Sequence, residues 1–442
     1  MDNIKTIIND TKPRYVDSPE VPTSHPSHGV SMSEQAIAAV VSNGWPGTKV
    51  ESVTPLGAGK SFNNKIYFLK MQHANKMAAL GEEDAVLKIN GTLYDGDKVQ
   101  NEVACLRLLE LYCPNLAFPR VLAWSEAGVT ATFVSTNHAE TKSLEALVPL
   151  DAESKNDVGW ILTTKVTGKV VNLEELDTAA ITDLALQLAD IVASWRLKIP
   201  AQKHCGSLKI REEAEQVTNG SGDGVTLDRP FGPGISKMAV RGNVVEEIKL
   251  SAPIGTMQEY YRLKLDNKLR QLESLDALAR NRHLLDPLKS LCEERLPRLN
   301  FDVMFTQSAI PTDTFQFTHY DLFPRNILVT GSPPRITGIV DWEFSGFFPP
   351  VDEFLDDWLD GGDWPREFYI PYLKRLEENG VATPTKSVRG DGWQMAWWLE
   401  KIIENAAPWW ALGENDEDRV KKILEKAEYV IQTMLENFES VQ

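Results

Sequence analysis

Cysteine and histidine are scarce in this sequence, and neither occurs in a clustered pattern. Only four cysteines occur in 442 residues, and no two of them form a C-x-x-C pair. This low and scattered content excludes a disulfide framework and predicts reduced, buried thiols. The seven histidines include no H-E-x-x-H or similar pair, so the sequence does not indicate a zinc site.

Long apolar runs and an excess of positive charge are also missing. No run reaches the roughly 20 apolar residues that a membrane helix needs. Residues 1–10 lack the basic flank and apolar stretch of a secretory signal. Lys and Arg number 46 against 63 Asp and Glu, a net charge of −17, which disfavours nucleic acid and anionic membranes as partners. We therefore expect a cytoplasmic protein with a small-molecule partner, and a cationic one is favoured.

The length and the residue pattern together predict two lobes. Single hydrophobic cores rarely grow beyond about 250–300 residues, and this chain has 442. Strand-like runs rich in Val, Ile, Tyr, Phe and Thr surround a single helix at about residues 97–112. After Gly168, apolar residues recur at helical spacing. The strand-like runs lie at residues 65–71, 84–89, 119–124, 129–134 and 160–166. We expect an arm with a short helix at 1–44, a small β-rich lobe at 45–168 and a large helical lobe at 169–442.

The strongest chemical signal is an H-x-D-x-x-x-x-N motif formed by His319, Asp321 and Asn326. Asp341 follows Asp321 by twenty residues, directly after the apolar run Ile339-Val340. Phosphoryl transfer requires this set: one carboxylate orients the acceptor hydroxyl, while a second carboxylate and an amide oxygen hold Mg²⁺. The alternative is a chance motif, which the apolar run before Asp341 disfavours.

These residues resemble the catalytic and metal-binding loops of the aminoglycoside phosphotransferase and choline kinase-like family. The form of the motif resembles the one common in fungal members of that family. The resemblance implies an α+β, two-lobed protein-kinase-like fold with a β-rich N-lobe and a mainly helical C-lobe. It implies Asp321 as catalytic base, His319 as a brace of its loop, and Arg325 in place of a lysine absent at Phe323. The implied metal ligands are Asn326 and Asp341, with Glu343 supporting either a second metal or the end of the strand.

The same resemblance implies a nucleotide site in the small lobe. Lys88, in the strand-like Ala-Val-Leu-Lys-Ile, and Glu102, in the helix, would form the ion pair that positions ATP phosphates. The alternative for this pair is a surface lysine and a solvated glutamate. Backbone near Thr164 and Val166 would bind adenine at the hinge. A phosphate-covering loop, for which a plain hairpin turn is the alternative, would comprise Gly57, Gly59, Ser61 and Asn63.

Two later features bear on the acceptor. Acidic residues gather at 352–363, among them Asp356 and Asp360, and could attract a cationic substrate; a solvated helix face is the alternative. Eight of the twelve tryptophans lie beyond residue 340, and they could form an aromatic pocket for an amine or simply pack in the core.

The sequence therefore predicts an ATP- and Mg²⁺-dependent phosphotransferase acting on the hydroxyl of a small, amine-bearing molecule. One alternative is a nucleotide-binding pseudokinase that serves as a scaffold. Another is an enzyme that uses ATP to activate a hydroxyl or carboxyl group for elimination or coupling.

Overall fold

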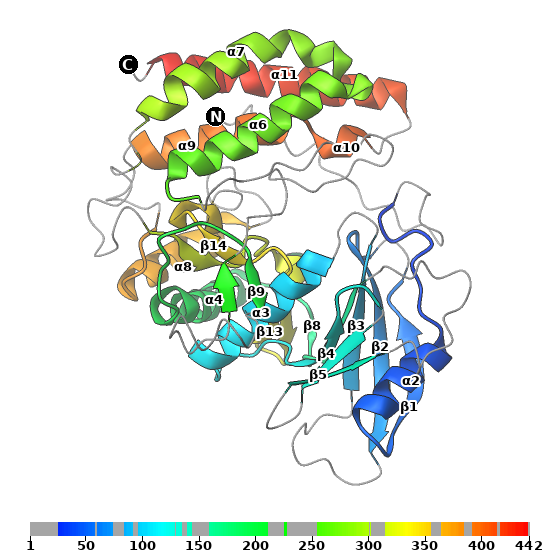
Figure 1. Cartoon of the computed structure of the whole chain (residues 1–442). Helices are drawn as coiled ribbons and strands as arrows, with labels where there is room; N and C mark the ends of the chain where they lie inside the picture. Colours follow the sequence, from blue (N-terminus) through cyan, green and yellow to red (C-terminus); the bar gives the residue numbers. More distant parts are fainter. Residues whose placement is uncertain are drawn as a thin grey trace.

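The chain forms a sheet-containing lobe and a helical lobe, which lie side by side in Figure 1. The computed structural model describes residues 25–57, 60–73, 84–91, 96–128, 130–134, 139–143, 159–210, 225–227, 254–299, 301, 314–354, 364–383, 391–412 and 416–440. The candidate residues Gly59, Asp356 and Asp360 lie outside these ranges. No helix in the described ranges is long and apolar enough to cross a membrane.

The small lobe is built on a seven-stranded antiparallel sheet with the strand order β1-β2-β3-β7-β4-β5-β6. Helix α2 (Glu34–Gly44) and helix α3 (Gly96–Tyr112) belong to two different hydrophobic clusters, so each covers its own part of the sheet. The strands are β1 (Thr48–Pro55), β2 (Asn64–His73), β3 (Asp84–Asn90), β4 (Val121–Ser125), β5 (Thr130–Val134), β6 (Ala139–Ser143) and β7 (Trp160–Thr164).

Helix α2 shows how local sequence sets a boundary. The Ser33 side chain accepts a hydrogen bond from the Ala36 N–H and so caps the first turn. Ile37, Val40 and Val41 recur at helical spacing and are buried, so one face of α2 packs in the same cluster as the sheet residues Leu69 and Leu87.

Helix α3 is unusual because its buried face carries polar residues. The Asn101 side chain is fully buried, and its Nδ2 donates to the carbonyl oxygens of Glu343 and Ser345 at 2.9 Å each. Its Oδ1 accepts from the Leu208 N–H at 2.6 Å. These three bonds join α3 to two segments of the large lobe, so they fix one lobe against the other.

The large lobe also contains short sheets. A three-stranded sheet has the order β13-β12-β8, and two further strand pairs are β11–β14 and β9–β10. Their bounds are β8 (Lys169–Val170), β9 (Leu208–Ile210), β10 (Val225–Leu227), β11 (Gln316–Thr318), β12 (Ile327–Thr330), β13 (Arg335–Ile339) and β14 (Gly346–Phe348).

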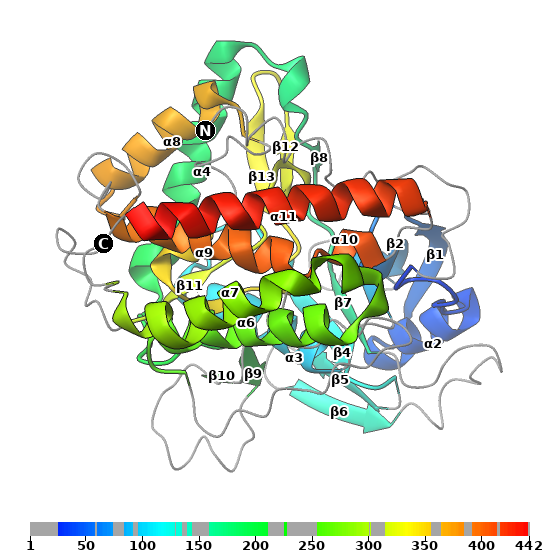
Figure 2. The same ribbon diagram turned by 90° about the horizontal axis from the view of Figure 1, so that it is seen from above.

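The helices of the large lobe form two groups. Helices α4 and α8 contact each other, and a second group with α6, α9 and α11 lies at one end of the molecule in Figure 1 and runs across the front of the view in Figure 2. The α-helices are α4 (Thr178–Lys198), α6 (Met257–Ser274), α7 (Leu285–Ser290), α8 (Arg366–Glu378), α9 (Asp391–Ala406), α10 (Trp409–Leu412) and α11 (Glu417–Ser440). The shorter helical segments are η1 (Leu173–Glu175), η2 (Asp276–Leu284), η3 (Leu291–Arg295), η4 (Leu296–Arg298), η6 (Pro324–Asn326) and η7 (Pro350–Glu353).

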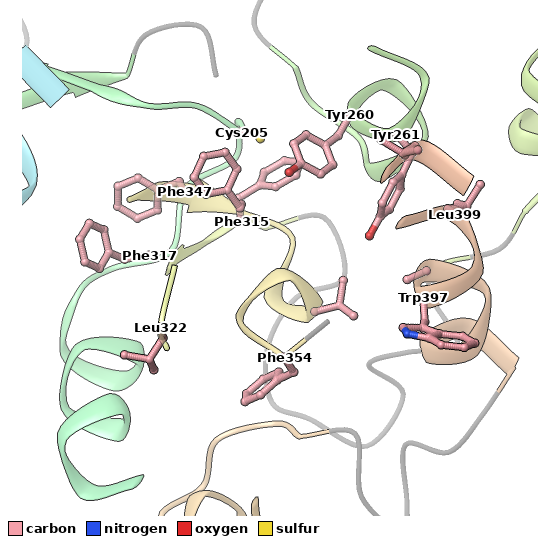
Figure 3. Packing of buried hydrophobic residues seen from close by; sticks show 14 of the residues in the cluster. Cys205, Tyr260, Tyr261, Phe315, Phe317, Leu322, Phe347, Phe354, Trp397 and Leu399 are labelled. Carbon is pink, nitrogen blue, oxygen red and sulfur yellow. The ribbon is translucent and has the colours of Figure 1, made fainter. Parts of the chain in front are cut away.

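Aromatic side chains fill the core of the large lobe, where strands β11 and β14 meet helices α6 and α9 (Figure 3). Phe317 stacks on Trp342 at 6.1 Å between ring centroids, and Trp342 meets Trp195 edge-on at 5.3 Å. The late tryptophans Trp397 and Trp398 are buried in the same core. For these described tryptophans the core-packing interpretation is therefore the correct one.

The α+β, two-lobed fold expected from the sequence is confirmed. The helix predicted at 97–112 is α3, and the strands predicted at 65–71 and 84–89 are β2 and β3. Strands β1 and β6 were not among the predicted strands. All four cysteines are buried and free, as their scattered positions indicated.

The bonds of Asn101 yield a stability prediction. Asn101→Ala should lower the free energy of unfolding by about 3 kcal/mol, because three buried hydrogen bonds of about 1 kcal/mol each are lost. Urea denaturation would measure the change. The control is Glu110→Ala on the exposed side of α3, which should shift stability by less than about 0.5 kcal/mol. Equal stabilities of the two variants would contradict the role assigned to Asn101.

Candidate active site

A cavity of about 870 Å³ takes its walls from both lobes. The small lobe contributes residues of β2, β3 and β7, and the large lobe contributes β12, the loops around Asp321 and Asp341, and helices α6 and α9. Six of the eight residues predicted to bind a nucleotide line it. They are Ser61, Asn63, Lys88, Glu102, Thr164 and Val166. Gly57 is exposed and does not line this cavity.

Lys88 lies at the centre of a buried charge cluster. Its Nζ is 3.0 Å from Glu102 Oε2, 2.6 Å from Asp341 Oδ1 and 2.6 Å from Glu343 Oε2. Burial alone would lower the pKa of Lys88, but Asp341, Glu102 and Glu343 raise it well above its usual value. Lys88 is therefore a permanent cation that joins β3, α3 and the loop after β13. The surface-lysine alternative is wrong.

Glu343 is fully buried and is surrounded by donors. Its Oε2 receives the Lys98 ammonium at 2.9 Å and the Asn64 amide at 2.8 Å, and its Oε1 receives the Asn63 amide at 2.9 Å. Burial alone would raise the pKa of Glu343, but the ammonium groups of Lys88 and Lys98 hold it below the usual range. This carboxylate thus ties the loop before β2 to the large lobe.

The Asp321 carboxylate faces the cavity from a loop that ends in the short helix η6. Asn326 Nδ2 donates to both the Asp321 backbone oxygen at 2.7 Å and Oδ2 at 2.9 Å, while the Arg325 guanidinium lies 2.5 Å from Oδ1. Burial raises the pKa of Asp321 to about 7, although Arg325 opposes this shift. A carboxylate with such a pKa can accept a proton near neutral pH.

His319 supports this loop from behind and does not line the cavity. Its Nε2 contacts the Val340 carbonyl oxygen at 3.1 Å, so Nε2 carries the hydrogen and Nδ1 accepts the Asp321 N–H at 3.3 Å. Burial lowers the pKa of His319 to about 3, which keeps the ring neutral. The backbone N–H of His319 donates to Glu353 Oε2 at 3.0 Å.

Two residues beside this histidine have left-handed backbones. Tyr320 has φ +71° and Asp341 has φ +69°. A non-glycine residue in this region carries conformational strain, and such residues gather at functional sites. The two positions place Asp321 and Asp341 on the walls of one cavity.

The hinge side of the cavity is apolar. Thr164 is anchored by backbone and side-chain bonds to Arg120, at 2.8 Å and 2.9 Å. A Cβ on Gly338 would lie 2.2 Å from Val166 Cγ1, so glycine is required where β13 meets the hinge. The apolar side chains here suit a flat aromatic ring. They include Leu56, Ile66, Val86, Ile161, Leu328 and Val340.

The opposite part of the cavity is charged. Helix α6 contributes Lys264 and Lys268, and helix α9 contributes Glu400 and Glu404. Lys264 forms a very short ion pair with Glu400 and donates to the Tyr320 hydroxyl at 3.1 Å. Asp352 also lines this part. No described cavity-lining residue is a tryptophan, so the aromatic amine pocket is not found in the part of the chain that the structure describes.

Sequence reasoning missed several of these residues. The buried amides of Asn64 and Asn101 and the buried ammonium of Lys98 carry no motif, and in a sequence they look like solvated polar residues. Lys264 and Lys268, four residues apart on α6, were missed for the same reason. The one available signal was polar residues at positions where helical periodicity calls for apolar ones.

Comparisons with solved structures give remote similarities. APH(2'')-IIa with streptomycin and ATP is 13% identical over 92% of this chain and 99% of that chain, with TM-score 0.48. ADP-bound aminoglycoside phosphotransferase APH(2'')-Ib is 12% identical over 91% and 99%, with TM-score 0.49. Ethanolamine kinase of Plasmodium vivax is 11% identical over 88% and 84%, with TM-score 0.44.

A search of curated proteins gives no match to this sequence. The resemblance to fungal members stays a prediction. A family-level match extends over residues 73–386, which is more than half of the chain, and it shows that the chain belongs to the phosphotransferase enzyme family.

Proposed function

We propose that this phosphotransferase uses ATP and Mg²⁺ to phosphorylate the hydroxyl group of a small, amine-bearing molecule. The observation that carries the proposal is that the Lys88–Glu102 ion pair and the residues Asp321, Asn326 and Asp341 line one cavity. Phosphoryl transfer depends on positioning and charge compensation, and this set supplies both.

In this proposal residues 45–168 are the nucleotide-binding lobe, residues 169–442 are the catalytic and substrate lobe, and 1–44 are an arm with a short helix. Adenine binds to the apolar wall beside Thr164 and Val166. The phosphates lie under Ser61 and Asn63, against Lys88. Gly57 and Gly59 belong to the same phosphate-covering loop in this proposal, because glycine permits close backbone approach to phosphate.

Magnesium fits the donors on the large-lobe side. Asp341 offers a carboxylate, and the amide nitrogen of Asn326 is occupied by Asp321, so its oxygen is the end left to coordinate. Hard cations such as Mg²⁺ prefer these oxygen ligands and take others from water and phosphate. No group of three His, Cys, Asp or Glu side chains in the described ranges could hold a metal ion. Glu343 was also predicted to hold the metal, but both of its carboxylate oxygens accept from lysine and asparagine donors. Its proposed role is therefore indirect, namely to position Lys88 and the phosphate-covering loop.

The transfer step needs a base and a neutralising charge. Asp321 accepts the proton of the acceptor hydroxyl while the oxygen of that hydroxyl attacks the γ-phosphorus of ATP. The bond between the γ-phosphorus and the β–γ bridging oxygen breaks at the same time. ADP and the phosphate ester are the products. Lys88 offsets the negative charge on the phosphates, and a metal held by Asn326 and Asp341 would add to this charge compensation. Arg325 lies beside the base, and His319 holds the loop in place.

We infer an amine on the acceptor from the acidic residues in the charged part of the cavity. Asp352, Glu400 and Glu404 line the cavity there, and Asp356 and Asp360 follow closely in sequence. The complete set of Lys88, Glu102, Asp321, Asn326 and Asp341 disfavours a pseudokinase scaffold. ADP accompanied by a phosphorylated product, rather than by free phosphate, would separate transfer from ATP-driven elimination or coupling.

The role of Asp321 as the base leads to a prediction for catalysis. Asp321→Asn keeps the shape of the side chain but cannot accept the proton, so kcat should fall at least about a hundredfold. ATP affinity should change little. Coupled detection of ADP measures kcat, with Asp276→Asn at a fully exposed aspartate as the control. A variant with near-normal turnover would exclude Asp321 as the base.

The role of Asp341 as a metal ligand leads to a prediction for Mg²⁺–ATP binding. Asp341→Asn suits the left-handed backbone, because asparagine tolerates positive φ, but it removes the charge that would hold Mg²⁺. Affinity for ATP in the presence of Mg²⁺ should fall at least about tenfold. Calorimetry with and without EDTA separates this loss from a general loss of ATP binding. Unchanged Mg²⁺–ATP affinity would show that Asp341 is not a ligand.

A further inference from the structure

Helix α6 presents two buried lysines to the charged part of the cavity, one turn apart. A capping box formed by Thr256 and Glu259 starts the helix, and Lys264 and Lys268 then fall at i and i+4 on one face. Lys264 is 2% exposed and Lys268 is 3% exposed, and both line the cavity. Lysine is almost never buried to this degree without a partner of opposite charge.

The two lysines differ in their partners. Lys264 has the Glu400 carboxylate. Lys268 Nζ donates to the backbone oxygen of Ala407 at 2.9 Å, and no carboxylate of the described residues lies within ion-pair distance of it. Glu404 lines the same cavity, but its carboxylate pairs with Lys401 at 3.3 Å. Lys268 is thus held by one neutral acceptor, and an ammonium group can donate three hydrogen bonds.

A buried charge with no carboxylate in contact with it is costly, and a ligand that places a carboxylate against it recovers part of that cost. Burial lowers the pKa of Lys268 to about 8, against the opposing effect of Glu404, so the group still carries its proton at neutral pH. One ammonium group matches one carboxylate. A phosphate would bring a second negative charge next to Glu400 and Glu404, which disfavours it.

We propose that Lys268 binds a carboxylate of the acceptor, so that the acceptor carries a hydroxyl, an amine and a carboxylate. This inference rests on the proposed function, because it takes the charged part of the cavity as the acceptor site. The amine lies against Asp352, Glu400 or Glu404, the carboxylate against Lys268, and the hydroxyl points toward Asp321. Acceptors of this class are hydroxylated amino acids and related zwitterions.

Matched pairs of amino alcohols test the assignment, because each pair differs only in the carboxylate. The pairs are serine and ethanolamine, homoserine and 3-aminopropanol, and 4-hydroxyproline and 3-hydroxypyrrolidine. With Mg²⁺–ATP and the full chain, the carboxylated member should have a kcat/KM at least about tenfold higher, equivalent to about 1.4 kcal/mol. Formation of the phosphorylated product is followed together with ADP release.

Three variants locate the preference. Lys268→Met should remove it by raising KM for the carboxylated member, with a much smaller change in kcat, and should leave ATP affinity intact. Lys268→Arg keeps the charge and should retain part of the preference, which covers the case in which the methionine variant fails to fold. Lys289→Met, at a partly exposed lysine on α7 that does not line the cavity, is the matched control and should behave as the native enzyme.

The outcomes separate this inference from the proposed function. Equal or better turnover of the carboxyl-free members, or an unchanged KM in Lys268→Met, overturns the role of Lys268. So does phosphorylation of carboxyl-free amines such as aminoglycosides when no carboxylated compound reacts. Failure of the native protein to bind Mg²⁺–ATP, or to phosphorylate any member of either group, instead counts against the proposed function.

Discussion

The buried carboxylate of Glu343 is the interaction on which the rest of the site depends. It lies between two lysines, Lys88 of β3 and Lys98 of α3, and between the amides of Asn63 and Asn64 at the start of β2. Desolvating so many polar groups is favourable only when each finds a partner, and here each does. Three elements of the small lobe therefore converge on one residue of the large lobe. This contact sets the position of Lys88 relative to Asp341, and with it the width of the cavity.

Strained backbone at two residues helps to position the aspartates on the large-lobe wall of the cavity. Tyr320 and Asp341 both have positive φ, and the His319 ring between them bonds to the Val340 carbonyl and to the Asp321 N–H. A neutral, buried imidazole is well suited to this role, because it donates at one nitrogen and accepts at the other. The strained residues persist because the surrounding bonds over-determine them. The geometry of the two aspartates is thus a property of the packed core beneath them.

The two parts of the cavity differ in kind. Next to the hinge, apolar side chains of both lobes form walls that suit a flat ring. Next to α6 and α9, the wall consists of lysines and glutamates. Lys264 forms an ion pair with Glu400, whereas Lys268 donates only to a backbone oxygen among the described residues. An apolar site with a few placed polar groups discriminates by shape, whereas a charged site discriminates by the charge pattern of its ligand. In the proposed function, the nucleotide takes the first part and the acceptor the second.

The sequence by itself determined the two-lobed α+β fold and helix α3, because hydrophobic periodicity acts over short stretches of chain. The pairing of Lys88 with Glu102 came from the family resemblance, and the contact distances confirm it. The sequence also identified Asp321, Asn326 and Asp341, since their spacing follows from the chemistry of phosphoryl transfer. Only the tertiary structure decided that Glu343 is enclosed by lysines and asparagines, and that Asn101 joins the lobes. It alone brought Lys264 and Lys268 to the cavity. Those positions depend on contacts between residues far apart in the chain, and a polar residue on a helix looks the same in sequence whether it faces water or a buried partner.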